Sequence, residues 1–254
     1  STVGIGWGSG WQHSEDAGGG GMLTCQCIFV LACLDFCLWP NQSLRHEHLA
    51  QGLRTLVQRD PSALSADRLV NTTEDTIRGW FLGFEIPNVA ERAKNIRELG
   101  YVLRVQCGGQ AALLVARAQH SAARLVEFLT CLLPNFRDQA VHKGRQCYFY
   151  SRGQTLVAEL WAAYGCPPPG SGSPYAFEDL EDMSTFADHR VPQILSYLGI
   201  IDYSNLLAGK IANSVGLQAG AEEEVRLQLG RRRLCDTVWS RINSFGVPLS
   251  VVRI

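Results

Sequence analysis

Apolar residues recur at helical spacing along most of this 254-residue chain, and this periodicity constrains its fold more than any other feature. Residues 87–100 show it best, because Pro87 can open a helix there, Gly100 can end it, and Arg92 falls on the charged face that should meet water. The apolar face of this stretch carries Val89, Ala93, Ile96 and Leu99. Alternating strand patterns are few, so the sequence predicts a mainly α-helical fold with few short strands.

The same spacing predicts further helices along the chain. They cover residues 48–58, 65–83, 121–133, 154–164, 192–198 and 203–213, and residues 145–151 form either a short strand or the entry to the next helix. Residues 166–174 are too rich in proline and glycine for regular structure. The acidic residues 178–182 are expected to be a solvated turn.

The N-terminal region has two parts of opposite character. Residues 1–21 are glycine-rich and predict a flexible or artefactual tail, which leaves residues 22–254 as a single helical domain. Residues 22–34 (MLTCQCIFVLACL) are apolar but shorter than the roughly 20 residues that span a bilayer. They also lack the basic flank and the cleavage site of a signal peptide, so we expect a buried core segment and no membrane association.

Charge and cysteine usage exclude several classes of function. A net charge of −1 argues against general binding to nucleic acid or anionic membranes, which depends on a strong positive field. The nine cysteines are scattered singly and read as reduced thiols of a cytoplasmic protein. The one cluster, Cys25, Cys27, Cys33 and Cys37, lacks the paired knuckles of a zinc site, so we expect neither a metal nor an organic cofactor.

Asp188 is the residue best placed for chemistry. It lies between Phe186 and a helix start at Val191-Pro192, where the positive end of the helix dipole should keep its carboxylate ionised. Such a carboxylate is either a helix cap or a preorganised anion that stabilises positive charge in a transition state. Cleavage of an N-glycosidic bond creates that charge on an oxocarbenium-like sugar.

Four segments carry a resemblance to a known family. They are residues 186–204 (FADHRVPQILSYLGIIDYS), residues 34–39 (LDFCLW), residues 133–138 (LPNFRD) and residues 147–158 (CYFYSRGQTLVA). In this order and at these separations they resemble the queuosine salvage proteins, a family of queuosine 5′-phosphate N-glycosylase/hydrolases. The family's segment matching residues 34–39 reads leucine-asparagine-phenylalanine, followed by tryptophan. The likeness runs from about residue 30 to residue 230.

The resemblance implies a fold related to DNA glycosylases and the hydrolysis of queuosine 5′-monophosphate to queuine and ribose 5-phosphate. It implies that Asp188 is the nucleophile or transition-state stabiliser and that Phe186 packs on the base. Phe36 and Trp39 are candidate pocket walls. Arg190 and Arg152 are the first candidates for the phosphate, followed by Arg137, which could instead pair with its neighbour Asp138.

The ends of the chain depart from the family's pattern. A helical region that precedes residues 34–39 in the family is replaced here by the glycine-rich tail, and a base-binding segment after about residue 230 is not matched. We therefore expect the domain to be incomplete at both ends. The alternative function is a catalytically silent module that binds queuine or a nucleotide, and a weaker third is a nucleic-acid glycosylase. The sequence leaves the oligomeric state open.

Overall fold

The computed structural model describes residues 21–38, 44–142, 144–183, 197, 203–213 and 215. These residues divide into two compact units. Residues 21–38, 44–137 and 150–182 form the first, which we call the helical unit. The second, which we call the hairpin unit, contains residues 138–142, 144–149 and the described positions from 183 onward.

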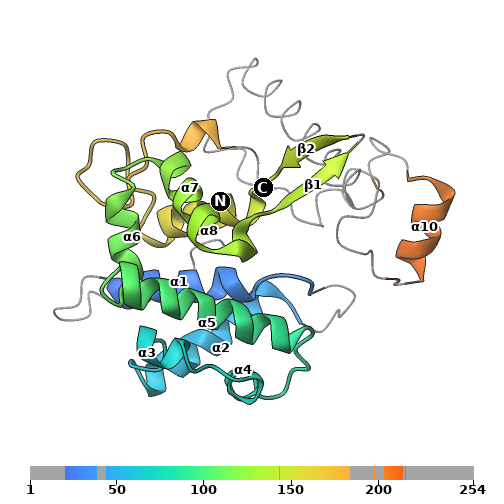
Figure 1. Ribbon diagram of the computed structural model, residues 1–254, viewed down its shortest axis with the longest axis horizontal. Coiled ribbons are helices and arrows are strands. Elements are labelled where there is room, and N and C mark those ends of the chain that lie inside the picture. The colour runs from blue at the N-terminus through green and yellow to red at the C-terminus, as the bar shows by residue number, and fades with distance from the viewer. Residues whose placement is uncertain are drawn as a thin grey trace, which may run out of the picture. The chain divides into compact units, whose positions relative to one another are not determined.

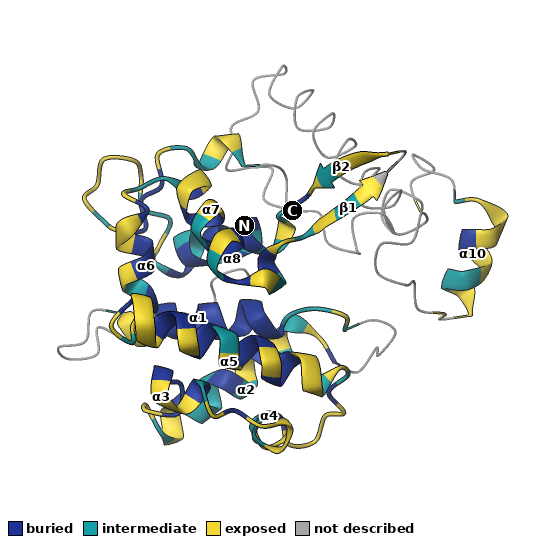
Figure 2. Cartoon of the chain, in the orientation of Figure 1, coloured by how far each residue is buried: buried dark blue, intermediate teal, exposed yellow. Residues whose placement is uncertain are grey.

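Helix α1 (Met22–Leu34) forms the centre of the helical unit and packs against α2, α5, α6 and α8 (Figure 1). Every residue from Cys25 to Leu34 is buried, as the dark colour of this helix shows in Figure 2. The segment is apolar on all sides, so it needs partners on all sides rather than along one stripe. The prediction of a buried core segment is confirmed, and the structure shows that this segment is a helix. Burial raises the pKa of Cys25, Cys27 and Cys33 to about 12, so these thiols remain neutral.

Three helices follow on one side of α1. Helix α2 (His46–Arg59) buries Leu49, Leu53 and Val57. The predicted helical stretch at residues 65–83 is two short helices, α3 (Ala66–Leu69) and α4 (Glu74–Trp80). They are separate because the Thr73 hydroxyl accepts a hydrogen bond from the backbone N–H of Thr76 and starts a new helix.

Helix α5 (Val89–Gln106) corrects two expectations. Gly100 does not end the helix, which continues past it and packs closely against α3 there. A Cβ atom at Gly100 would lie 2.6 Å from the backbone nitrogen of Val70, so the missing side chain makes this approach possible. Arg92 does not face water and is fully buried. Its position in the helical repeat predicts a side chain that faces water, but the repeat carries no information about the segments that pack over it.

The remaining helices of this unit are α6 (Ala111–Arg117), α7 (Ala122–Leu132), the short 3₁₀ turn η1 (Pro134–Phe136) and α8 (Ser151–Ala163). Ser121 caps α7, as its position predicts. Asp179, just before the 3₁₀ turn η2 (Leu180–Asp182), also caps α7: its carboxylate accepts from the backbone N–H groups of Ala122 and Ala123 at 2.5 and 3.1 Å. The acidic turn is therefore not merely solvated.

The hairpin unit contains the two strands that the structure describes. Strand β1 (Gln139–His142) pairs antiparallel with β2 (Arg145–Tyr148), which confirms the strand alternative at residues 145–151. The backbone N–H of Phe149 donates to the carbonyl of Asp138 at 2.8 Å and closes the open end of the hairpin. Helix α10 (Asn205–Ala212) confirms the predicted helix at residues 203–213, whereas the one at 192–198, apart from Tyr197, lies outside the described residues.

The structure thus confirms a mainly α-helical fold with few strands, and the relationship to DNA glycosylases stays a prediction. Among the described residues, no single helix combines the length and apolarity needed to cross a membrane. Helices α5 and α6 meet that test only as a pair, and they are bent by 65° to each other. All eight cysteines within the described part of the chain are free thiols.

Candidate functional site

Charged side chains from three helices, α2, α5 and α8, meet Asp35 and Phe36 just after α1 ends. We call these two residues the Asp35–Phe36 corner. Arg92 of α5 holds the backbone of this corner, because its Nη1 donates to the carbonyl of Leu34 and its Nη2 to that of Phe36 at 2.6 Å. Its Nε donates to the carbonyl of Pro87 at 2.7 Å. Burial lowers the pKa of Arg92 to about 10, so the guanidinium remains charged at neutral pH.

The Phe36 ring lies close to two guanidinium groups. The Cζ atom of Arg92 is 4.3 Å from the ring centroid and that of Arg152, from α8, is 5.0 Å from it. Both distances are within the range of a cation–π interaction. Arg152 also donates from Nη1 to the carbonyl of Asn135 at 2.6 Å, which fixes one side of its planar fork. Its Nε and Nη2 donate to none of the described residues and can therefore reach a ligand.

His46, the first residue of α2, bridges two carboxylates. Its Nδ1 is 2.8 Å from Oδ2 of Asp35, and its Nε2 is 3.5 Å from Oε1 of Glu159 on α8. Burial by itself lowers the pKa of His46, but the hydrogen bond to Asp35 and the charge of Glu159 outweigh it and raise the pKa to about 9. The imidazole is therefore a cation at neutral pH.

Glu159 is nearly enclosed, with 11% of its side chain exposed. Burial raises its pKa to about 7, although the neighbouring charge of His46 works in the opposite direction. Its carboxyl group is therefore partly protonated at neutral pH. Buried groups with shifted pKa values gather at functional sites more often than elsewhere, which adds to the case for this cluster.

The balance of charge at the corner favours an anion. Three basic side chains, Arg92, Arg152 and His46, face two carboxylates, of which Glu159 is only partly ionised. No carboxylate forms an ion pair with Arg92 or Arg152 among the residues that the structure describes. A guanidinium fork with open donors matches the geometry of phosphate or carboxylate oxygens.

The structure brings two of the sequence-predicted site residues together, because Phe36 and Arg152 lie in contact at the corner. The other four, Trp39, Phe186, Asp188 and Arg190, lie outside the described residues.

Arg137, the third candidate for the phosphate, donates from Nε to the carbonyl of Thr130 at 2.7 Å and from Nη2 to that of Cys131 at 3.0 Å. It thus caps the C-terminal end of α7.

Sequence reasoning missed Arg92, Asp35, His46 and Glu159 as members of this cluster. One signal was present in the sequence, since Glu159 is the only acidic residue within the largely apolar residues 154–164. A lone carboxylate in such a helix needs a buried partner. His46 and His48 are two residues apart, and their imidazoles have different partners: His46 bridges the two carboxylates, whereas His48 stacks on Phe84 at 4.7 Å between ring centroids.

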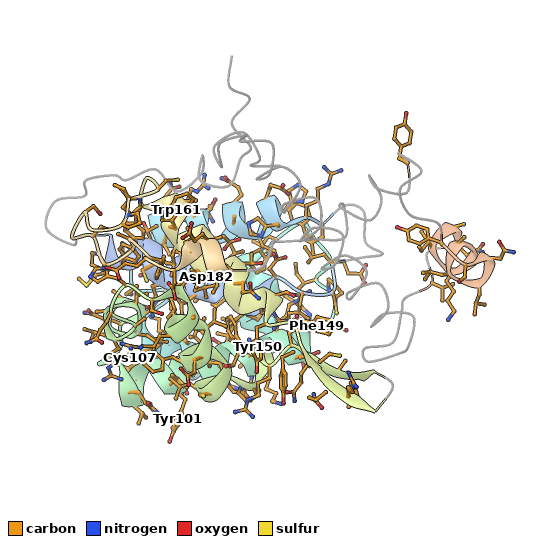
Figure 3. All side chains as sticks on the ribbon, turned by 90° about the horizontal axis from the view of Figure 1, so that it is seen from above. Tyr101, Cys107, Phe149, Tyr150, Trp161 and Asp182 are labelled. Carbon is orange, nitrogen blue, oxygen red and sulfur yellow. The ribbon has the colours of Figure 1, made fainter. Side chains whose placement is uncertain are left out.

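A second concavity shares no residue with the corner. It has a volume of about 410 Å³ and is lined by Val70, Arg97, Glu98, Tyr101, Val102, Leu132 and Pro134. Tyr101, labelled in Figure 3, is 57% exposed and points away from the helices. No group of three or more metal-binding side chains converges within the described part of the chain.

Comparison with known proteins places the chain among relatives of one kind. It is 39% identical over 206 residues to a protein of Dictyostelium discoideum, 32% identical over 240 residues to one of Sphaerobacter thermophilus, and 34% identical over 143 residues to one of Mus musculus. Each is named queuosine 5′-phosphate N-glycosylase/hydrolase. These alignments cover 81%, 90% and 56% of this chain.

The chain spans 62% of the length of the Dictyostelium relative, 71% of the Sphaerobacter relative and 41% of the mouse relative. The sequence profile described as queuosine salvage protein matches residues 16–243, which include both the Asp35–Phe36 corner and the segment around Asp188. The chain therefore belongs to the queuosine salvage protein family.

Proposed function

We propose that this chain hydrolyses the N-glycosidic bond of queuosine 5′-phosphate and releases queuine for salvage. The observation that carries the proposal is the family match over residues 16–243, together with relatives that are each named for this activity. The electropositive corner supports it, because the substrate is a phosphate monoester and needs a local cationic site on a chain whose net charge is −1.

In the proposed mechanism Asp188 acts on the sugar. As the bond between the sugar C1′ and the base nitrogen breaks, positive charge grows on the sugar, and the Asp188 carboxylate stabilises that charge or attacks C1′. Water then supplies a hydroxyl to C1′ and a proton to the departing base, so that the products are ribose 5-phosphate and queuine. A 7-deazapurine has no N7 to protonate, which makes stabilisation of the sugar cation the larger contribution.

The other site residues are assigned to binding. Phe186 packs on the base and Trp39 and Phe36 are walls of its pocket, since an aromatic face stacks on a base for roughly 1–3 kcal/mol. Arg152 and Arg190 hold the 5′-phosphate. Arg152 suits this role because Nε and Nη2 donate to none of the described residues while Nη1 is anchored at Asn135. The mechanism requires no metal and no organic cofactor.

The substrate in this proposal is a small nucleotide, and we place the chain in the cytoplasm. Free thiols at the eight described cysteines suit a reducing compartment. We assign the activity to a single helical domain over residues 22–254.

Incubation of the purified chain with queuosine 5′-monophosphate, with free queuine followed by chromatography, tests the proposal. Asp188→Asn should reduce kcat by at least about 10²–10³-fold, since it removes the charge that stabilises the transition state. Asp182→Asn is the matched control, because Asp182 is exposed and close in sequence, and it should retain normal turnover. A folded wild-type chain that binds the nucleotide but releases no queuine would instead favour the silent binding module.

A further inference from the structure

Helix α8 is linked to both residues of the Asp35–Phe36 corner, to Phe36 directly and to Asp35 through His46. Arg152 and Glu159 are seven residues apart on α8, which is close to two helical turns, so their side chains lie on the same face. Arg152 lies against the Phe36 ring, and Glu159 faces His46, which binds Asp35. The two adjacent corner residues therefore connect to α8 through two separate contacts.

The backbone conformation next to the corner is unfavourable in itself, so contacts with other segments are needed to hold it. Cys37, which follows Phe36 directly, has a φ of 48°, in the left-handed region that non-glycine residues rarely adopt. A conformation of this kind persists only where surrounding contacts over-determine it, and it is common near functional sites. Arg92 holds the corner through backbone carbonyls. The His46 bridge is the contact that holds an acidic side chain of the same corner.

We infer that protonated His46, held between Asp35 and Glu159, is a positioning residue that keeps Phe36 and Arg152 in place for the substrate anion. The inference rests on the proposed function for the identity of that anion. His46 acts through the corner and does not itself need to touch substrate. Loss of the imidazole proton would leave Glu159 without its cation and Asp35 with a weaker hydrogen bond, and both links from the corner to α2 and α8 would loosen.

The charges around His46 determine when it loses that proton. Among the described residues, three carboxylates act on it, Asp35 from the corner, Glu159 from α8 and Glu47 from its own helix, and all three favour the charged imidazole. Two arginines of the cluster, Arg92 of α5 and Arg152 of α8, lie against Phe36. On α4, which packs on α2, the carboxylates Glu74 and Asp75 pair with Arg78. Glu159 faces His46 at 3.5 Å and is not a corner residue, so its substitution changes the charge on His46 while Asp35 and Phe36 stay in the sequence.

The experiment compares the wild-type chain with Glu159→Gln by NMR over pH 5.5–10. The signals followed are the His46 imidazole, assigned from its loss in His46→Gln, and the Nε–H group of Arg152. In the wild type both should change with the same midpoint, near pH 9. In Glu159→Gln both midpoints should fall together, by about 1–3 pH units, because an opposite charge close to His46 has been removed. Glu127→Gln, an exposed carboxylate on α7, is the matched control and should leave both midpoints unchanged.

The same three proteins are then assayed for turnover of queuosine 5′-phosphate. KM should rise above the His46 midpoint, by up to tenfold per pH unit, and this limb should move to lower pH in Glu159→Gln. If Glu159 had a purely structural role, Glu159→Gln would lower the stability of the fold and would not shift the pH at which KM rises.

The two proposals fail in different ways. If the Arg152 signal does not follow the His46 titration, or if the KM limb stays in place while the His46 midpoint moves, the positioning role is wrong whatever the activity. If the wild-type chain does not turn over the nucleotide but Arg152 follows His46 in both proteins, the proposed function is wrong and the positioning role stands.

Discussion

Replacing Arg92 by methionine should be one of the most damaging single substitutions in the helical unit. The guanidinium is fully buried and donates to three backbone carbonyls, those of Pro87, Leu34 and Phe36. Methionine fills a similar length with apolar atoms but donates no hydrogen bond. Each buried acceptor that loses its partner costs about 1–3 kcal/mol, and the cation–π contact with Phe36 is worth up to about 2 kcal/mol.

Part of that cost is recovered, because the variant no longer buries a charge. We therefore expect Arg92→Met to lower the free energy of unfolding by about 3–5 kcal/mol, a large part of the roughly 5–15 kcal/mol that stabilises a typical domain. Arg104→Met is the matched control on the same helix, since Arg104 is exposed in the last turn and should cost no more than about 1 kcal/mol.

Urea unfolding, followed by far-ultraviolet circular dichroism and by tryptophan fluorescence, measures both variants. Coincident transitions from the two probes would justify a two-state analysis. Arg92→Lys adds a further comparison, because it keeps the charge but loses the planar fork and should still destabilise. A loss below about 1 kcal/mol for Arg92→Met, or an equal loss for Arg104→Met, would refute the claim that these carbonyl contacts hold α1 and α5 together.

Three other perturbations are predicted from the same contacts. Gly100→Ala should cost about 1–3 kcal/mol in thermal unfolding because its Cβ would meet the backbone of Val70, whereas Gly79→Ala, with open space around it, should stabilise by up to about 1 kcal/mol. Asp179→Ala should cost about 1–2 kcal/mol and speed hydrogen exchange at the start of α7, whose backbone amides lose their acceptor; unchanged exchange would contradict the cap. The folded chain should lose stability as pH rises from about 6.5 to 9, because His46 keeps its proton up to about pH 9 in the folded state and only to about pH 6.5 in the unfolded state. A free energy of unfolding that stays constant over this pH range would argue against the contact of His46 with Asp35 and Glu159.

The helical architecture could be predicted because it depends on local periodicity. The buried α1, the cap at Ser121 and helix α10 each follow from a few neighbouring residues. Arg92 and Gly100 could not be placed in this way. Their roles depend on the tertiary contacts of α5 with α1 and α3. A glycine can end a helix at one position and allow close packing inside a helix at another, and the local sequence does not distinguish the two.

The candidate site shows the same division. Phe36 and Arg152 were found through segments that resemble a family, and they lie together in space. His46 lies on α2 and Glu159 lies on α8 with Arg152, and no short sequence pattern links a residue of one helix to its partner on another. A contact between two ionisable side chains is set by packing, and the pKa shifts that reveal it exist only in the folded chain.

The burial of every residue from Cys25 to Leu34 in α1 has a consequence for biosynthesis. This helix leaves the ribosome well before α5, α6 and α8, which later cover it. At about 5–20 residues per second, an apolar helix would be without its partners for on the order of ten seconds. During that interval the nascent chain would expose a continuous apolar segment, to which trigger-factor-like or Hsp70-like holdases would bind. Productive folding in the cell should therefore depend on chaperone capacity more strongly than the final stability of the chain would suggest.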